Sequence, residues 1–220
     1  MVLNFKNSTL ENSAKEFQPW EFGIASMIMT DLESVGLFNI ISKERLKDIL
    51  EQMAFQQYGF VDDQEAVKIG KIAAAKYLLT GSFMELNGFL RIEAQVFSVE
   101  RGVQLGAAEI TGRTSTFFHM EKKLVIKVLN YMDVVLNKNE VNLIAKNIET
   151  RSIDASLNNY AGEVSVIKAN ELKKKGESSE ADSLIKEAEN NFKKALQHDP
   201  NYTRAKKNLL KLAKAIPMTI

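Results

Sequence analysis

The feature that most constrains the fold is a run of alternating residues between positions 77 and 111, interrupted by two turns. Asn87-Gly88 is a pair that readily supplies the two positive-φ positions of a tight hairpin turn. From residue 90 to residue 96, apolar side chains alternate with polar ones, which indicates a strand with one solvent-exposed face. Arg101-Gly102 makes a second turn into a strand at residues 103–111. This pattern therefore predicts three consecutive antiparallel strands.

Helical spacing flanks these strands on both sides. Apolar residues recur every three to four positions over residues 24–35, and Gly36 stands where a left-handed cap ends a helix. Short apolar runs at residues 2–5 and 38–41 are typical of buried strands. The resulting order predicts an α/β fold with a mixed, mostly antiparallel sheet and helices packed on it. The other predicted helices are residues 45–53, a helix that follows a capping box at Asp62 and Glu65, residues 117–136 and residues 141–148.

A polar joint near residues 150–155 divides the chain into two predicted domains, residues 1–150 and an all-α helical-hairpin tail at residues 151–220. Lys and Arg number 29 and Asp and Glu 28, so the formal charge is +1. The tail holds 13 basic and 9 acidic residues, or +4, against 16 and 19, or −3, before it. This balance lacks the strong basic footprint of a nucleic-acid-binding protein, so we predict no nucleic-acid partner.

Two short stretches resemble parts of a phosphate-binding loop. Gly70-Lys71 and Thr80-Gly81-Ser82 contain the residue types, but such a loop requires a strand, then the glycines and lysine, then a helix. Here a helix precedes the strand. We therefore interpret Gly70 as a site of close helix-to-sheet packing, Lys71 as solvated and Gly81 as a close backbone approach or a bulge.

The sequence also lacks the usual motifs of catalytic and metal-binding sites. The chain has no cysteine, and His119 and His198 stand far apart without further residues at metal-ligand spacing. Asp62 and Asp63 with Glu65 are better explained as helix capping than as a cation site, because the glycine and the ligand alternation of such a site are absent. We predict no catalytic residue, no cofactor and no metal, and therefore that the protein is not an enzyme.

Five aromatic residues are candidates for binding a protein partner, because aromatic side chains are enriched at interfaces. Phe17, Trp20 and Phe22 follow the first predicted strand, and the alternative for at least one of them is packing under the first helix. Tyr160 and Tyr202 lie in the tail.

The amino-terminal half resembles the CsgG family, the curli production assembly and transport component, across residues 2–112. That family is related in fold to the amino-terminal domain of TolB and to outer-membrane activators of penicillin-binding proteins. The resemblance implies export to the periplasm, association with the outer membrane, a lipid anchor and self-assembly, with a native signal peptide already removed. It rests on Leu3-Asn4-Phe5 with Asn7, residues 24–32, Gly36-Leu37-Phe38, Ser42-Lys43-Glu44-Arg45-Leu46, Ile49-Leu50, residues 66–71 and residues 77–82.

One property of the curli channel does not transfer to this chain. A membrane-spanning strand needs about 9 to 11 residues. The predicted hairpins turn at Asn87-Gly88 and Arg101-Gly102 without an insertion of that kind. We therefore do not predict the pore function of the curli channel for this chain.

The tail resembles the second helix and exit of a tetratricopeptide repeat, with its first helix at residues 156–175 and an insert at residues 173–179 that departs from the repeat. One such repeat cannot bury both its faces and needs a neighbour to stack on. The resemblance rests on Ala188, Phe192, Ala195, Asp199-Pro200, Tyr202, Ala205 and Leu209.

Together these features predict a non-catalytic cell-envelope assembly or adaptor protein that binds protein partners in secretion or envelope biogenesis. Two alternatives stay open: a subunit of an outer-membrane secretion channel, and a small-ligand-binding or enzymatic α/β domain. A helix at residues 202–215 with five basic residues suits either an acidic partner or the cap of a repeat.

Overall fold

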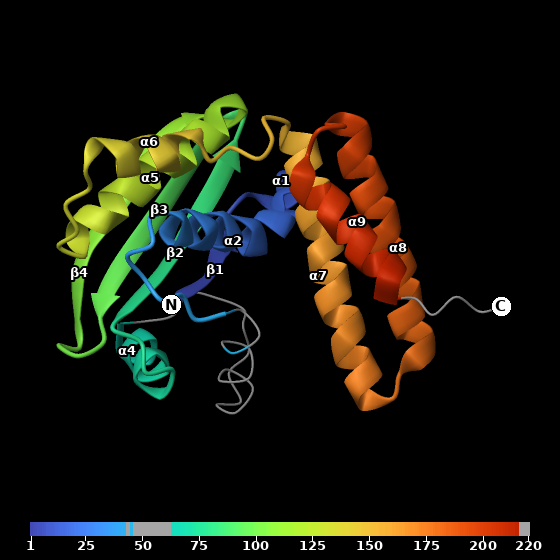
Figure 1. Cartoon of the computed structure of the whole chain (residues 1–220), viewed down its shortest axis with the longest axis horizontal. Helices are drawn as coiled ribbons and strands as arrows, with labels where there is room; N and C mark the ends of the chain where they lie inside the picture. The colour runs from blue at the N-terminus through green and yellow to red at the C-terminus, as the bar shows by residue number, and fades with distance from the viewer. Residues whose placement is uncertain (43–44, 46–62, 216–220) are drawn as a thin grey trace. The chain divides into compact units, whose positions relative to one another are not determined.

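The computed structural model describes residues 1–42, 45 and 63–215 of the chain. It divides into two compact units, Met1–Asn147 and Ile148–Ile220, which we call unit 1 and unit 2 (Figure 1). Unit 1 contains a sheet with helices, whereas the described residues of unit 2 form helices and the segments that connect them, with no strand.

Unit 1 is built on a four-stranded mixed sheet in the order β1-β2-β3-β4 (Figure 1). β1 runs parallel to β2, and the other neighbours are antiparallel, which confirms the predicted fold class and the three-stranded meander. The first turn has positive φ at both Asn87 (52°) and Gly88 (80°), as its residue types predict. The strands are β1 (Val2–Asn7), β2 (Tyr77–Leu86), β3 (Phe89–Ser98) and β4 (Val103–Arg113).

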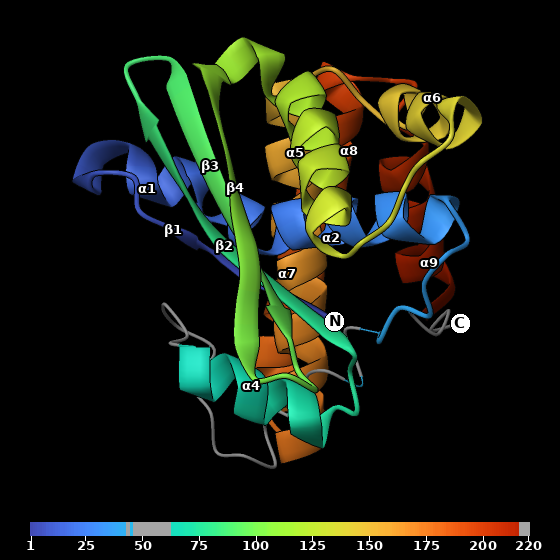
Figure 2. The same cartoon turned by 90° about the vertical axis from the view of Figure 1, so that its left-hand side faces the viewer.

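Helices α2 and α5 pack on one face of this sheet, which we call the inner face (Figures 1 and 2). α2 begins at Pro19, whose fixed φ and missing N–H suit a first helical position, and Gly36 follows its end with φ of 68°. Trp20 of α2 is completely buried and stacks on Phe117 of α5 with ring centroids 4.0 Å apart. The helices of unit 1 are α1 (Glu11–Phe17), α2 (Pro19–Ser34), α4 (Asp63–Ile72), α5 (Phe117–Tyr131) and α6 (Lys138–Lys146), with a 3₁₀ turn at Thr114–Thr116.

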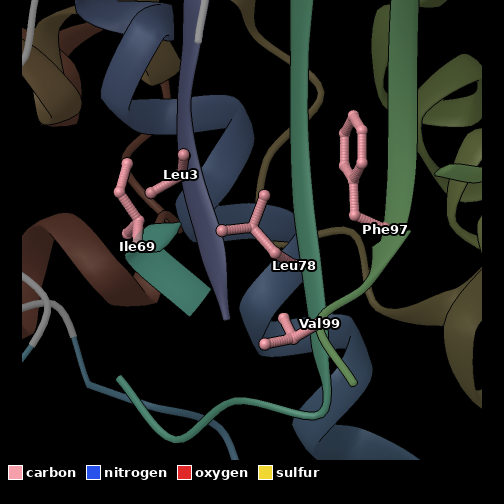
Figure 3. Packing of buried hydrophobic residues seen from close by; sticks show 5 residues of the cluster. All are labelled: Leu3, Ile69, Leu78, Phe97 and Val99. Atoms are coloured by element: carbon pink, nitrogen blue, oxygen red, sulfur yellow. The ribbon is translucent and has the colours of Figure 1, made fainter. Parts of the chain in front are cut away.

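Helix α4 forms a second, smaller core with the beginning of β2 and the end of β3 (Figure 3). Ile69 of α4 is buried there among Leu3, Leu78, Phe97 and Val99. These strand side chains alternate with the ones that face α2 and α5, so α4 lies against the opposite face of the sheet. Val2 and Leu3 point to opposite faces of the sheet and are both buried, and an irregularity between Val2 and Phe5 shifts the register of β1.

Two sequence predictions in unit 1 are wrong. Residues 38–41 form no strand and are only partly buried, because a short apolar run becomes a strand only where a partner edge is available. The helix predicted at residues 117–136 ends at Tyr131, and Val135, an apolar residue within the predicted range, is 94% exposed. The predicted helix at residues 45–53 and the cap at Asp62 lie outside the described residues, apart from Arg45.

Unit 2 consists of α7 (Ile153–Lys175), α8 (Ser178–His198) and α9 (Thr203–Ala215). Ser152 caps α7 by accepting a hydrogen bond from the N–H of Ala155, and Gly176 ends it with φ of 84°. α7 and α8 form a tight pair because a Cβ on Gly162 would approach the ring of Phe192 to 2.5 Å. The predicted all-α tail is therefore confirmed, whereas its identity as a tetratricopeptide repeat stays a prediction.

Candidate functional site

The aromatic residues predicted to bind a partner in unit 1 pack largely within that unit. Trp20 contacts Phe17, Phe83 and Phe117, with ring centroids 5.3, 6.5 and 4.0 Å away. Phe17 is buried and Phe22 is half-buried. The structure therefore brings Phe17 and Trp20 together as core residues of α1 and α2, and a role for Phe17, Trp20 or Phe22 in binding a partner stays a prediction.

The two tyrosines predicted in unit 2 are also buried, at 0% exposure for Tyr160 and 1% for Tyr202. They lie beside Arg204, whose guanidinium is 5.7 Å from the centre of the Tyr160 ring and whose Nε is 2.6 Å from Glu149 Oε2. Burial raises the pKa of both tyrosine hydroxyls, so both are neutral across the physiological range. This cluster ties α9 to α7 and to the joint before it, and direct contact of Tyr160 or Tyr202 with a partner stays a prediction.

The exposed candidate surface is the sheet face opposite α2 and α5, at the end that the β2–β3 turn closes. Three large apolar side chains are exposed there: Met84 at 36%, Leu86 at 47% and Phe89 at 51%. Cross-strand pairing of Leu86 with Phe89 and of Met84 with Arg91 places them on one face. We call this surface the outer sheet face and define it as Met84, Leu86, Phe89, Arg91, Glu93, Glu109, Thr111 and Arg113.

Charged side chains surround the apolar residues of the outer sheet face. Arg113 lies opposite Phe89 in the β3–β4 pair, with its guanidinium 5.6 Å from the ring centre. Arg91 forms ion pairs with both Glu93 and Glu109. An exposed apolar centre with a charged rim is the anatomy of many protein interfaces.

Strand β4 is an edge of the sheet, and two of its backbone carbonyl groups accept hydrogen bonds from side chains of α5. Tyr131 donates a hydrogen bond of 2.9 Å to the carbonyl of Ala107, and Lys127 donates one of 2.9 Å to the carbonyl of Glu109. An open edge strand is a template for pairing with another chain, and native proteins often block it. Lys127 and Tyr131 therefore obstruct strand addition along β4.

A cluster of charged groups is buried between α2 and α5. Lys122 donates a hydrogen bond of 2.7 Å to Asp31 Oδ2 and lies 2.8 Å from Glu121 Oε2. Asn147, just after α6, donates one of 2.7 Å to Asp31 Oδ1. The Asp31 and Glu121 side chains are fully buried and that of Lys122 is 7% exposed. Two carboxyl groups thus share one ammonium group.

The proton affinity of this cluster follows from its burial. Desolvation raises the pKa of Glu121 to about 8, outweighing the favourable charge of Lys122, and the neighbouring Asp31 adds to the rise. Desolvation also raises the pKa of Asp31. Burial alone would lower the pKa of Lys122, but its two carboxyl neighbours raise it. The ammonium therefore stays charged, and Glu121 holds its proton at neutral pH.

This cluster was not predicted from the sequence, although the positions of two of its residues carry a signal. Asp31 stands three residues after Ile28 and seven after Ile24, on the apolar stripe of its helix. Glu121 stands four residues after Phe117 and three before Leu124, on the stripe of α5. A charged residue at a position that periodicity assigns to the core indicates a buried polar contact, because an unpaired charge there is costly.

The structure agrees with the interpretation of the glycine-lysine stretch. Gly70 lies inside α4, before β2, and a Cβ at this position would overlap the side chain of Val99. Lys71 is exposed, and a Cβ on Gly81 would overlap the ring of Phe5. Both glycines therefore serve close packing, as predicted.

The described residues give no support to metal or membrane-spanning sites. Within residues 1–42, 45 and 63–215, no three His, Cys, Asp or Glu side chains gather as metal ligands would. The side chains of Asp62 and Asp63 fall outside what is described. None of the helices in the described part of the chain has the length and apolar character that crossing a bilayer requires.

Comparison with solved structures finds proteins of similar chain course at low identity. The LpoB C-terminal domain from Escherichia coli is 18% identical over 52% of this chain and 81% of that one, with a TM-score of 0.41. The same domain from Salmonella enterica is 17% identical over 51% and 80%, with a TM-score of 0.39. PelC from Paraburkholderia phytofirmans, a dodecamer, is 18% identical over 59% and 83%, with a TM-score of 0.35. Similarity at this level carries no conclusion about function.

Sequence comparison gives a firmer assignment. None of the curated proteins with which the chain was compared matches it. In contrast, the family model described as "Curli production assembly/transport component CsgG" matches residues 1–95, a span that includes β1, α2, α4, β2 and most of β3. The resemblance to the CsgG family is therefore confirmed for residues 1–95 of this chain.

Proposed function

We propose that this protein is a non-catalytic assembly or adaptor protein of the cell envelope, which binds a protein partner through the outer sheet face. The observation that carries the proposal is the match of residues 1–95 to a family described as an assembly and transport component. Under this proposal residues 1–150 form the CsgG-like domain and residues 151–220 a tetratricopeptide-like domain that offers a second protein contact.

The chemistry of the outer sheet face supports binding of a protein. Phe89 and Leu86 adjoin each other at the end of a hairpin, where a partner can bury both side chains at once. Aromatic side chains, methionine and arginine are enriched at protein interfaces, and the surrounding charges help to select the partner. Arg113 and the Arg91–Glu109 pair provide those charges around the apolar centre.

The cellular place of the protein belongs to the same proposal. The family description motivates a periplasmic, outer-membrane-associated protein, with a lipid anchor and self-association as further features. Fractionation of cells that express the native gene tests this part, because the protein would then co-sediment with outer membranes. Recovery in the cytosolic fraction would contradict the localisation but leave the protein-binding surface open to its own test.

The binding surface is tested by cross-linking the intact protein in envelope extracts and comparing two variants. The first, Leu86→Thr with Phe89→Thr, removes the apolar centre but keeps residues that favour strands. The control, Leu143→Thr, removes an equally exposed leucine (53%) from α6, outside the sheet. We expect the first variant to lose a specific cross-linked protein that the wild type and the control retain.

Two results would contradict the proposal. One is a partner that cross-links equally to all three proteins, which would place the contact elsewhere. The other is the absence of any specific cross-link together with a rise in melting temperature on adding nucleotides or small metabolites, which would favour a ligand-binding domain.

A further inference from the structure

Helix α9 concentrates the positive charge of unit 2. Its sequence, TRAKKNLLKLAKA, contains five basic residues and no acidic one. Since residues 151–220 hold 13 basic and 9 acidic residues in all, the remainder of this segment has 8 against 9. The net charge of +4 in the tail is therefore due to a single helix.

Four of the five basic side chains share one exposed side of α9. With 3.6 residues per turn, Lys206, Lys207, Lys211 and Lys214 fall within an arc of about 140°, and Leu210 lies inside that arc. All four lysines are exposed, and Leu210 is 62% exposed. We call these five residues the basic face of α9.

The opposite side of α9 is already occupied within unit 2. Ala205 packs with Ala155, Ala195 and Tyr202, and Leu212 packs with Ala188 and Phe192. The fifth basic residue, Arg204, is engaged with Glu149 on this inner side. The basic face is therefore not needed for packing α9 onto its own unit.

The lysines of the basic face have no ion-pair partner among the described residues. In the described part of unit 2, ion pairs are formed by Arg204, Lys173, Lys193 and His198, and none by the four lysines of this face. Four like charges on adjacent turns repel one another when no anion is present. An anionic surface along the helix would relieve this repulsion.

The type of cation indicates the nature of that surface. Arginine, with its planar fork, is the usual choice where a protein pairs with defined carboxylates, whereas the lysine ammonium is a compact, strongly hydrated charge. The apolar side of α9 is already buried in unit 2, so its four exposed lysines correspond to the basic clusters that anionic lipid headgroups attract electrostatically. We propose that the basic face of α9 binds the headgroups of anionic phospholipids at a membrane surface, with Leu210 entering the headgroup region.

The test uses the full chain and vesicles of two compositions, phosphatidylcholine alone and phosphatidylcholine containing phosphatidylglycerol. We expect co-sedimentation with the anionic vesicles only, and release when salt is added, because the attraction is screened. Each lysine near an anionic surface strengthens binding by about fivefold. The variant Lys207→Gln with Lys211→Gln should therefore weaken binding by about 25-fold.

A matched control removes the same charge from another helix of unit 2. Lys193 and Lys194 are exposed on α8, so Lys193→Gln with Lys194→Gln lowers the net charge equally without touching the basic face. We expect this variant to bind nearly as the wild type does, and Leu210→Ala to bind several-fold more weakly. Circular dichroism of each variant checks that the helices are retained.

Three outcomes would overturn the proposal. Equal loss of binding in both double variants would show that net charge alone is responsible. Equal binding to both vesicle compositions would exclude recognition of anionic lipid. Failure to bind anionic vesicles, together with tight binding to polyglutamate that depends on Lys207 and Lys211, would identify an acidic protein segment as the occupant.

Discussion

Lys122 of α5 donates a 2.7 Å hydrogen bond to Asp31 of α2, across 91 residues of sequence and in the buried interior of unit 1. The same ammonium group lies 2.8 Å from its chain neighbour Glu121. Burial of three ionisable groups is costly unless each has a partner, so the cluster holds α2 and α5 in one arrangement.

Replacing Lys122 by methionine should destabilise unit 1 strongly. The side chain keeps its approximate volume, but Asp31 and Glu121 then face each other without a cation, and removing one partner of a buried ion pair typically costs about 3–5 kcal/mol. Urea unfolding followed by fluorescence measures this change in unit 1, since Trp20 is the single tryptophan of the chain and is buried there.

The adjacent lysine provides the control for this measurement. Lys123 is exposed on the same helix, so Lys123→Met should change the free energy of unfolding by no more than about 0.5 kcal/mol. Equal effects at the two positions would mean that the buried cluster contributes nothing specific.

The stability of unit 1 should fall as pH rises from 4.5 to about 8, the interval between the ordinary and the folded-state pKa of Glu121. The folded state binds this proton more tightly than the unfolded chain does. The stabilisation that Glu121 contributes is therefore fully present below pH 4.5 and is lost as the pH rises towards about 8. Asp31 acts in the same direction. Trp20 fluorescence in urea at several pH values measures the trend.

Glu121→Gln separates this effect from the other titrating groups. Glutamine mimics the protonated carboxyl group, so the variant should lose most of the decline in stability over this interval. A decline of the same size in Glu121→Gln and in the wild type would assign the pH dependence to other residues.

Gly70 and Val99 should show strong energetic coupling. Gly70→Ala places a methyl group against Val99, and such overpacking costs about 1–3 kcal/mol, more than the gain of about 1 kcal/mol in helix propensity. In a Val99→Ala background the clash is gone, so the same substitution should become neutral or stabilising. Chemical denaturation of the four proteins of this cycle measures the coupling, and additive effects would refute the close contact.

Removing the two side chains that occupy the β4 edge should promote self-association. Lys127→Ala with Tyr131→Phe frees the carbonyl groups of Glu109 and Ala107 to accept hydrogen bonds from another strand. Size-exclusion chromatography with light scattering should detect larger species at concentrations where the wild type does not form them. Lys123→Ala, on the same helix, should behave as the wild type.

The sheet of unit 1 was largely predictable because its signals are local. Asn87-Gly88 specifies a tight turn by its backbone preferences, and alternation over residues 90–96 identifies the buried face. The run at residues 38–41 has the same local character but is no strand, since pairing depends on an available edge elsewhere in the fold. The run at residues 2–5 does form β1, because the edge of β2 is available to it.

The candidate site was less predictable, because exposure is a property of the whole fold. Trp20 and Tyr160 look like binding residues by composition, yet they are completely buried. Leu86 and Phe89 flank a turn that the sequence identifies, but which side of the hairpin α2 and α5 cover is decided by packing across long separations. The same holds for Asp31 and Lys122, which meet only after folding.

The pairing of β1 with β2 also determines the order in which unit 1 is able to fold. β2, β3 and β4 are joined by tight turns and form from neighbouring residues, whereas Val2 pairs with Leu79 and closes a long loop. On the ribosome β1 emerges first but has no strand to join until β2 has been synthesised. β2 then exposes an unpaired edge until β1 docks, so the moments after synthesis are when this chain is most open to aggregation.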